Sequence, residues 1–178
     1  GDVALALERE RGRLCGAGAR PVLASDFCRP MLTGAKAKLA DRGSPLAEAD
    51  AMRLPLPDGS VDVITVAYGF RNLANYRRGL EEFHRVLAPG GRVAILEFSQ
   101  PTVPLLGPMF DLYFRHVLPR IGNAVSGAGD AYSYLQKSVE RFLSAEALEA
   151  LMGEVGFEDT RFERLTGGIS CLHLGTRR

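Results

Sequence analysis

Residues 68–72 of the chain read YGFRN and directly follow an apolar run, VDVITVA, at residues 61–67. A run of this length and composition is typical of a buried strand, so Arg71 and Asn72 stand at its carboxyl end. A guanidinium group can stabilise a developing negative charge, and an amide can orient a hydroxyl group. A structural interpretation also fits the spacing, in which Arg71 pairs with a nearby carboxylate and Asn72 caps a turn.

The elements around this pair alternate between strand and helix patterns. Buried strands are predicted over 21–25, 61–67 and 91–98, a further strand end is expected after SPLAEAD, and helices are predicted over 1–14, 30–42, 77–88 and 144–155. Ser144 is the expected N-cap of the last helix and Gly156 its stop, and residues 157–165 and 168–177 are expected to form a closing antiparallel pair. This order predicts a single α/β domain with a doubly wound, mostly parallel sheet.

Ligands of such sheets bind outside the carboxyl ends of the strands. Asp26 follows the first predicted strand, and Asp50 and Ala51 follow SPLAEAD. A carboxylate in the first position can accept both hydroxyl groups of a ribose, and one in the second can accept the amino group of an adenine ring, for which Ala51 leaves room. The alternatives are a charge favourable to the dipole of the next helix for Asp26 and a simple cap for Asp50.

Composition excludes several classes of function. The 22 basic and 21 acidic residues show no run of one sign, which gives no electrostatic case for binding nucleic acid. The three cysteines have no Cys-x-x-Cys spacing and the three histidines are scattered, so neither a disulfide framework nor a metal site is predicted. No apolar stretch approaches the length of about 18 residues that a membrane span needs, and a cytoplasmic location is expected.

Four ordered stretches make the pattern specific. They are YGFRN (68–72), RVLAPGGRVAILEFS (85–99), RHVLPRIG (115–122) and DAYSYLQKSVERF (130–142). With them the chain resembles the class I S-adenosylmethionine-dependent methyltransferases, and within these the ubiquinone/menaquinone biosynthesis C-methyltransferase family. The resemblance extends over essentially the whole chain.

The chain departs from the pattern of that family in two places. The glycine-rich loop that follows the first strand is represented only by Gly1 and Asp2, and Ala67 stands where many members have a serine that touches the cofactor. Loss of the first strand, the centre of the sheet in this fold, would leave a gap of about 10 Å at a strand spacing of ~4.8 Å. We therefore expect that the sequence is an N-terminally truncated version of a longer protein.

The resemblance implies transfer of a methyl group from S-adenosylmethionine to a ring carbon of a demethylated polyprenyl quinol. It implies that Gly1, Asp26, Asp50, Ala51 and Ala67 bind the cofactor. Arg71 would stabilise the phenolate of the substrate and Asn72 would orient its hydroxyl group. His116, Tyr134 and Asp130 are the candidates for the general base, and each could instead be structural.

The family inserts a helical segment after the strand that ends at Phe98, here at about 101–142. Its residues 104–122 carry a wide apolar surface, which we interpret either as ordinary core packing or as a substrate lid that receives the polyprenyl tail at a membrane surface. Contact with a membrane surface and a homodimer are the two assemblies considered.

Three other functions fit parts of the sequence. A related methyltransferase that acts on another small lipid or on a polyketide would share every motif. A nicotinamide-dependent oxidoreductase would share the acidic strand end, but the closing strand pair and LAPGGRVAILEF are typical of methyltransferases. Ala67 and the absent glycine loop are the only support for a catalytically impaired scaffold.

Overall fold

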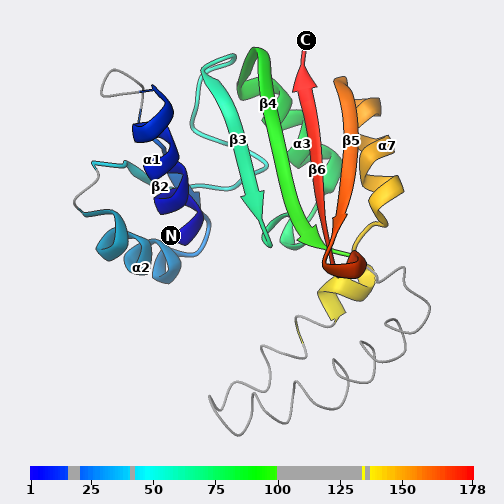
Figure 1. Cartoon of the computed structure of the whole chain (residues 1–178), viewed down its shortest axis with the longest axis horizontal. Helices are drawn as coiled ribbons and strands as arrows, with labels where there is room; N and C mark the ends of the chain where they lie inside the picture. The colour runs from blue at the N-terminus through cyan, green and yellow to red at the C-terminus, as the bar shows by residue number, and fades with distance from the viewer. Residues whose placement is uncertain (16–20, 41–42, 100–133, 135–136) are drawn as a thin grey trace, which may run out of the picture. The chain divides into compact units, whose positions relative to one another are not determined.

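The computed structural model of the chain describes residues 1–15, 21–40, 43–99, 134 and 137–178. Two compact units, Gly1–Leu56 and Pro57–Arg178, are distinguished, and each is described by itself. The predicted alternation of helices and strands is confirmed (Figure 1). The helices are α1 (Asp2–Cys15), α2 (Arg29–Leu39), α3 (Tyr76–Val86) and α7 (Ala145–Val155), and the strands are β1 (Ala24–Asp26), β2 (Leu46–Glu48), β3 (Val61–Ala67), β4 (Leu87–Phe98), β5 (Phe157–Leu165) and β6 (Ser170–Arg177).

The first unit packs two helices with a short parallel strand pair. β1 pairs with β2, with Asp26 opposite Glu48 at the carboxyl end. The buried core comprises Ala4, Ala35 and Leu39, with Leu5, Val22, Ala24 and Leu46 packed against it. α2 has Pro30 in its first turn, as predicted, and extends to Leu39, while residues 41–42 at the end of the predicted helix lie outside the described residues.

Glu8 joins the parts of this unit through a buried carboxylate. Its side chain accepts hydrogen bonds from the backbone N–H of Val22 at 2.6 Å, from Nε of Arg11 at 2.8 Å and from Oγ of Ser44 at 2.9 Å. These bonds link α1 to the segments that lead into β1 and β2. Burial by itself would raise the pKa of Glu8, but the three donors outweigh it and hold the pKa below its ordinary value of 4.5.

Because the pKa of Glu8 is lowered in the folded state, its contribution to stability is complete above pH 4.5 and decreases as the pH falls below that value. We expect Glu8→Gln to lower the free energy of unfolding at pH 7, and the difference from the unsubstituted protein to shrink at pH 4 and below. Urea titrations at both pH values measure this. Glu10→Gln is the control, because Glu10 pairs with Arg13 on the exposed side of the same helix. An equal difference at both pH values would contradict the assignment.

The second unit is built on a four-stranded sheet in the order β3-β4-β6-β5. β3 and β4 are parallel, whereas β6 runs antiparallel to both β4 and β5, so the predicted closing antiparallel pair is confirmed. The carboxyl ends of β3 and β4 therefore lie at the edge of the sheet where β6 begins, with Phe98 opposite Ser170 (Figure 1). β4 begins at Leu87 rather than at residue 91, because Leu87 already pairs with Val61.

Helices α3 and α7 pack together on one face of this sheet (Figure 1). Ser144 caps α7 by accepting a hydrogen bond from the N–H of Ala147, and Gly156 ends the helix with a left-handed φ of 109°, both as predicted. The core between helices and sheet comprises Leu80, Phe83, Val86, Val93, Ile95, Leu148, Met152, Phe157 and Cys171. On β4 the buried positions alternate, which is the expected period of a strand with one covered face.

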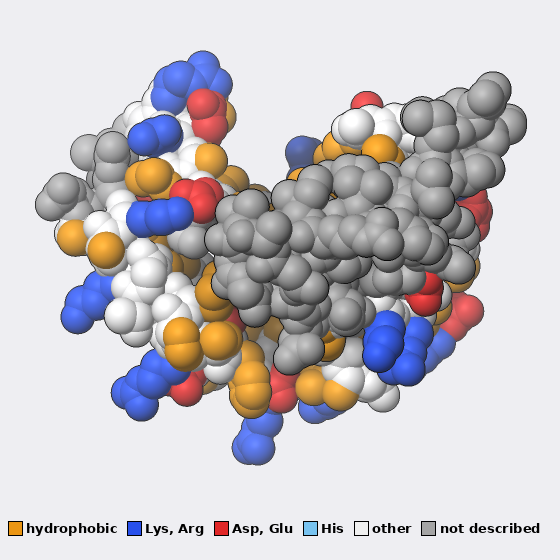
Figure 2. Space-filling model, turned by 90° about the horizontal axis from the view of Figure 1, so that it is seen from below, with side chains coloured by type: hydrophobic (Ala, Val, Ile, Leu, Met, Phe, Trp, Pro, Cys, Tyr) orange, Lys and Arg blue, Asp and Glu red, His pale blue; other side chains and the backbone are white. Residues whose placement is uncertain are grey.

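Charges on the visible surface are mixed. On the face shown in Figure 2, described Lys and Arg side chains are interspersed with Asp and Glu and form no continuous basic area. Within the described ranges, no helix is both long and apolar enough to cross a membrane. The predicted lid at 101–142, including its apolar stretch 104–122, falls largely outside the described residues.

Candidate active site

The loop after β3 is tied to the sheet at both ends. Tyr68 continues the strand ladder by donating its N–H to the carbonyl of Leu96 at 2.8 Å, and it then takes a left-handed φ of 55°. A short 3₁₀ turn, η2 (Phe70–Asn72), follows. Phe70 is 1% exposed, and its ring packs near those of Tyr76 and Phe83 with centroid distances of 5.7 and 6.1 Å. This anchor fixes the backbone that carries Arg71 and Asn72.

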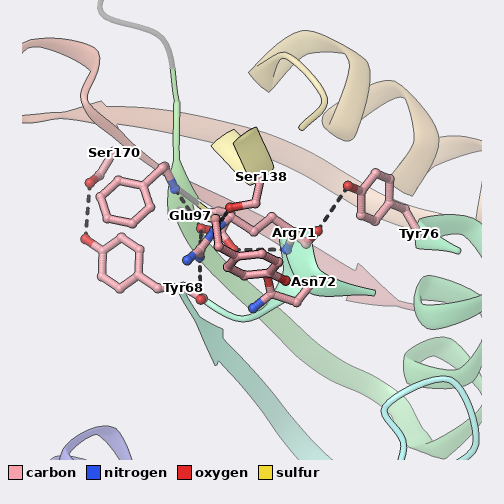
Figure 3. A network of polar contacts seen from close by, with 9 residues as sticks. Tyr68, Arg71, Asn72, Tyr76, Glu97, Ser138 and Ser170 are labelled. Carbon is pink, nitrogen blue, oxygen red and sulfur yellow. Dashed lines mark hydrogen bonds and ion pairs between the residues drawn. The ribbon is translucent and has the colours of Figure 1, made fainter. Parts of the chain in front are cut away.

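Arg71 is held mainly by protein acceptors (Figure 3). Its Nη1 lies 2.8 Å from Oε1 of Glu97 and also donates to the carbonyl of Tyr68, and its Nε donates to Oγ of Ser138 at 3.2 Å. The guanidinium carbon lies 5.2 Å from the ring centroid of Phe98. In the described part of the chain, nothing accepts a hydrogen bond from Nη2. Three of the five N–H donors thus bind acceptors among the described residues, and the two on Nη2 have no acceptor there.

Glu97 is a member of this site to which the sequence reasoning gave no role, although it counted residues 97–100 among the strand ends. Its side chain is fully buried, and its carboxylate also accepts the backbone N–H groups of Arg71 at 3.1 Å and of Phe98 at 2.9 Å. The sequence contained a signal for it: Glu97 continues the two-residue alternation of Val93 and Ile95, so a carboxylate occupies a buried position of β4. The structural interpretation of Arg71, pairing with a carboxylate, is therefore met in this structure.

Asn72 contacts another predicted site residue. The hydroxyl group of Tyr134 donates to Oδ1 of Asn72 at 3.0 Å, which orients the amide and leaves its Nδ2 hydrogens for another acceptor. Tyr76 donates its hydroxyl to the carbonyl of Arg71 at 3.2 Å. Burial and the negative charge of Glu97 raise the pKa of Tyr76, so this donor keeps its proton. His116 and Asp130, the other candidates for the general base, lie outside the described residues.

The predicted cofactor carboxylates lie in the first unit, at one edge of the β1–β2 pair. Asp26 ends β1, and Asp50 follows β2 by two residues; the N–H of Ala49 donates to the carbonyl of Asp26 at 3.1 Å. Each carboxylate uses one oxygen on its own loop, since Oδ1 of Asp26 accepts from Cys28 N and Oδ1 of Asp50 from Met52 N, both at 2.8 Å. The second oxygen of each has no partner within the described ranges. Two neighbouring acceptors of this kind fit a ligand with hydroxyl and amino donors, as the ribose and adenine of S-adenosylmethionine provide.

The remaining predicted cofactor residues are small. Gly1 precedes α1, and a Cβ atom at this position would lie 2.9 Å from Cα of Ala35, so the close packing of α1 on α2 requires glycine here. Ala51 follows Asp50 in a turn of the first unit, and Ala67 ends β3 in the second unit, opposite Leu96. Gly1, Asp26, Asp50 and Ala51 thus belong to the first unit and Ala67 to the second.

Comparison with known proteins decides the family. The sequence profile of the ubiE/COQ5 methyltransferase family matches residues 1–177. The chain belongs to this family. The resemblance stated from the four motifs is confirmed, and with it the class of enzyme, a methyltransferase.

Named relatives of this methyltransferase cover most of its length. It is 46% identical over 99% of its length to the demethylmenaquinone methyltransferase of Thermus thermophilus, of which it spans 78%. It is 47% identical over 88% of its length to the demethylmenaquinone methyltransferase of Deinococcus radiodurans, of which it spans 66%. It is 40% identical over 92% of its length to the ubiquinone/menaquinone biosynthesis C-methyltransferase UbiE of a Marinomonas species, again spanning 66%.

Two solved structures share this fold. An S-adenosylmethionine-dependent methyltransferase from Aquifex aeolicus superposes with a TM-score of 0.66 at 17% identity, over 98% of this chain and 78% of that one. Another, from Thermotoga maritima, gives a TM-score of 0.62 at 21% identity, over 89% of this chain and 73% of that one. The predicted class I methyltransferase fold is confirmed.

Proposed function

We propose that this methyltransferase transfers a methyl group from S-adenosylmethionine to a ring carbon of a demethylated polyprenyl quinol in the biosynthesis of respiratory quinones. The observation that carries the proposal is the identity of 46–47% to two proteins named demethylmenaquinone methyltransferase. The relative named for both quinones is 40% identical, so demethylmenaquinol is the first substrate to test. The polar groups at the end of β3 match what this reaction requires.

The chemistry needs an oriented phenolate. When bound, S-adenosylmethionine supplies an electrophilic methyl group, whose bond to sulfur breaks as the new carbon–carbon bond forms. The quinol carbon becomes nucleophilic when the neighbouring hydroxyl loses its proton. After methyl transfer the hydrogen on that carbon leaves as a proton, which restores the aromatic ring, and the oxygen is protonated again. Arg71 remains protonated, so it serves as a donor to the developing phenolate through Nη2 rather than as a base. Asn72, whose amide is oriented by Tyr134, donates from Nδ2 to a substrate oxygen and holds the ring in place.

Asp26 and Asp50 are proposed to bind the methyl donor through the oxygens that their own loops leave unused. Asp26 accepts hydrogen bonds from the ribose hydroxyl groups, and Asp50 accepts one from the amino group of adenine. The small side chain of Ala51 leaves space for the adenine ring. Phe27, whose side chain is 76% exposed next to Asp26, offers an apolar surface for the adenine ring. Gly1, in the same unit as Asp26 and Asp50, is proposed to approach the cofactor through its backbone, and the cofactor contact of Ala67 stays a prediction.

Asp26→Asn separates cofactor binding from folding. Asparagine retains the Oδ1 acceptor for Cys28 N, so the turn before α2 is kept, but it loses the charged acceptor for the ribose. We expect the Kd for S-adenosylmethionine to rise about 10- to 100-fold, as removal of a charged hydrogen-bond partner predicts. Isothermal titration measures it. Asp58→Asn, a surface change at the pair with Arg85, is the control and should leave Kd unchanged. Equal affinities for all three proteins would contradict a ribose role.

A polyprenyl substrate resides in a membrane, and we propose that the enzyme meets it at the membrane surface through segment 104–122. His116 in this segment remains, with Tyr134 and Asp130, one of three candidates for the base that takes the hydroxyl proton. A homodimer also stays a prediction.

Methyl transfer itself tests the proposal. The complete protein is incubated with methyl-labelled S-adenosylmethionine and reduced, short-tailed demethylmenaquinol, and the label is expected in the ring of the product. Menaquinol, whose ring carbon is already methylated, and the oxidised demethylated quinone, which has no hydroxyl to deprotonate, are the controls and should remain unlabelled. The proposal fails if the protein binds the methyl donor but labels neither demethylated naphthoquinols nor the corresponding benzoquinols.

A further inference from the structure

The carboxylate of Glu97 is buried in the second unit. A carboxylate without solvent contact strongly destabilises the folded state unless an opposite charge and hydrogen bonds compensate for its lost hydration. Glu97 receives that compensation largely from the loop after β3, because Arg71 contributes both its backbone N–H and its Nη1 to the two carboxylate oxygens. The main chain and the side chain of Arg71 thus bind the same carboxylate, which restricts the conformation of the Arg71 side chain.

A second acceptor completes the orientation of Nη1. The carbonyl of Tyr68 also accepts from this atom, and Tyr68 has the left-handed φ of 55° that a non-glycine residue adopts only at an energetic cost. With Nη1 bound by Glu97 and Tyr68, and Nε bound by Ser138, the plane of the guanidinium group is determined. Figure 3 shows these contacts of Arg71; among the described residues they leave the two N–H groups of Nη2 as the donors that a ligand can use.

We infer that Glu97 is a positioning residue for methyl transfer, which acts through Arg71 by fixing the direction in which Nη2 presents its donors. The inference rests on the proposed function. It also means that the pair with Glu97 neutralises most of the charge of Arg71, so that the contribution of Arg71 to the reaction depends on direction and distance more than on net charge. A misplacement of about 1 Å at such a donor is sufficient for a large loss of rate, on the order of 100-fold.

A double-mutant cycle in the complete protein tests whether Glu97 acts through Arg71. We expect Glu97→Gln to lower kcat about 10- to 100-fold, with KM for S-adenosylmethionine changed less than about twofold. In the Arg71→Ala background the same substitution should change kcat by less than about twofold, because the group that it positions is gone. Losses that multiply would overturn the inference.

Glu82→Gln is the matched control. Glu82 is also buried and also paired with an arginine, Arg85 on the same helix, with oxygen–nitrogen distances of 2.9 and 2.7 Å. If these ion pairs serve only the stability of the fold, kcat of the Glu97→Gln and Glu82→Gln proteins will fall only in proportion to the fraction of each protein that is folded. The inference requires instead that the folded Glu82→Gln protein keeps kcat within about twofold while the folded Glu97→Gln protein does not.

Hydrogen exchange gives a readout that needs no substrate. Glu97→Gln should accelerate exchange of the amide hydrogens of Arg71, Asn72 and Leu73, and Glu82→Gln should not. If the unsubstituted protein methylates no quinol, the proposed function fails, while this experiment still decides whether Glu97 fixes the loop. Unchanged exchange at Arg71 in the Glu97→Gln protein overturns the inference whatever the substrate.

Discussion

Arg71→Ala is expected to lower kcat about 100- to 1,000-fold on demethylmenaquinol, the range found when one donor to a developing oxyanion is removed. The substitution also leaves Glu97 as an uncompensated buried charge, because its side chain is fully buried and its partner is lost. We therefore expect the free energy of unfolding to fall by about 3–5 kcal/mol as well. Single-turnover rates in the presence of saturating S-adenosylmethionine, together with urea titrations, measure the two effects.

The double variant Arg71→Ala, Glu97→Gln separates the effect of Arg71 on catalysis from its effect on stability. A neutral amide at position 97 removes the buried charge, so the double variant should be more stable than Arg71→Ala alone. Its kcat should remain low, because no donor has returned. Recovery of kcat together with stability would show that Arg71 serves the fold alone, which is the structural interpretation that the spacing of YGFRN also allowed.

Much of the fold could be predicted because each element carries a local signal. The run 61–67 coincides with β3, and Ser144 and Gly156 delimit α7 through a side-chain cap and a left-handed residue that local sequence specifies. The antiparallel pair of β5 and β6 was predicted from the patterns of residues 157–165 and 168–177, whereas the pairing of β6 with β4 was not. The predicted start of β4 was less accurate, because a tertiary contact sets it: the pairing of Leu87 with Val61.

The site was predictable only in part, since a sequence places residues on strand ends but does not pair them. Asp26 and Asp50 lie at one edge because parallel neighbouring strands share their carboxyl ends, which the strand order already implied. The partners of Arg71 come from distant segments, with Glu97 on the next strand and Ser138 far along the chain. Nothing local marks Ser138 as an acceptor, and the role of Tyr134 as a donor to Asn72 depends on a contact across 62 positions.

Phe70 anchors the same loop through apolar packing. Among changes that leave every polar group of the site in place, its replacement by alanine should lower stability and kcat the most. The ring is 1% exposed and lies 5.7 Å from Tyr76, 6.1 Å from Phe83 and 6.3 Å from Phe142 between ring centroids. Phe70→Ala should lower the free energy of unfolding by about 3–5 kcal/mol and Tm by roughly 10 °C.

Phe70→Ala should also lower kcat, measured at a temperature where the variant is still folded. With its anchor gone, η2 no longer fixes Arg71 and Asn72, so kcat should fall about 10-fold or more while the Kd for S-adenosylmethionine is unaffected. Phe70→Leu is the graded control: it keeps an apolar side chain of similar volume and should cost less than about 1.5 kcal/mol. Calorimetry and kcat measured on both variants distinguish the two roles of the ring. Full kcat in a destabilised but folded Phe70→Ala protein would mean that hydrogen bonds to Glu97, Tyr68 and Ser138 suffice to position Arg71, and that the aromatic cluster serves only the core.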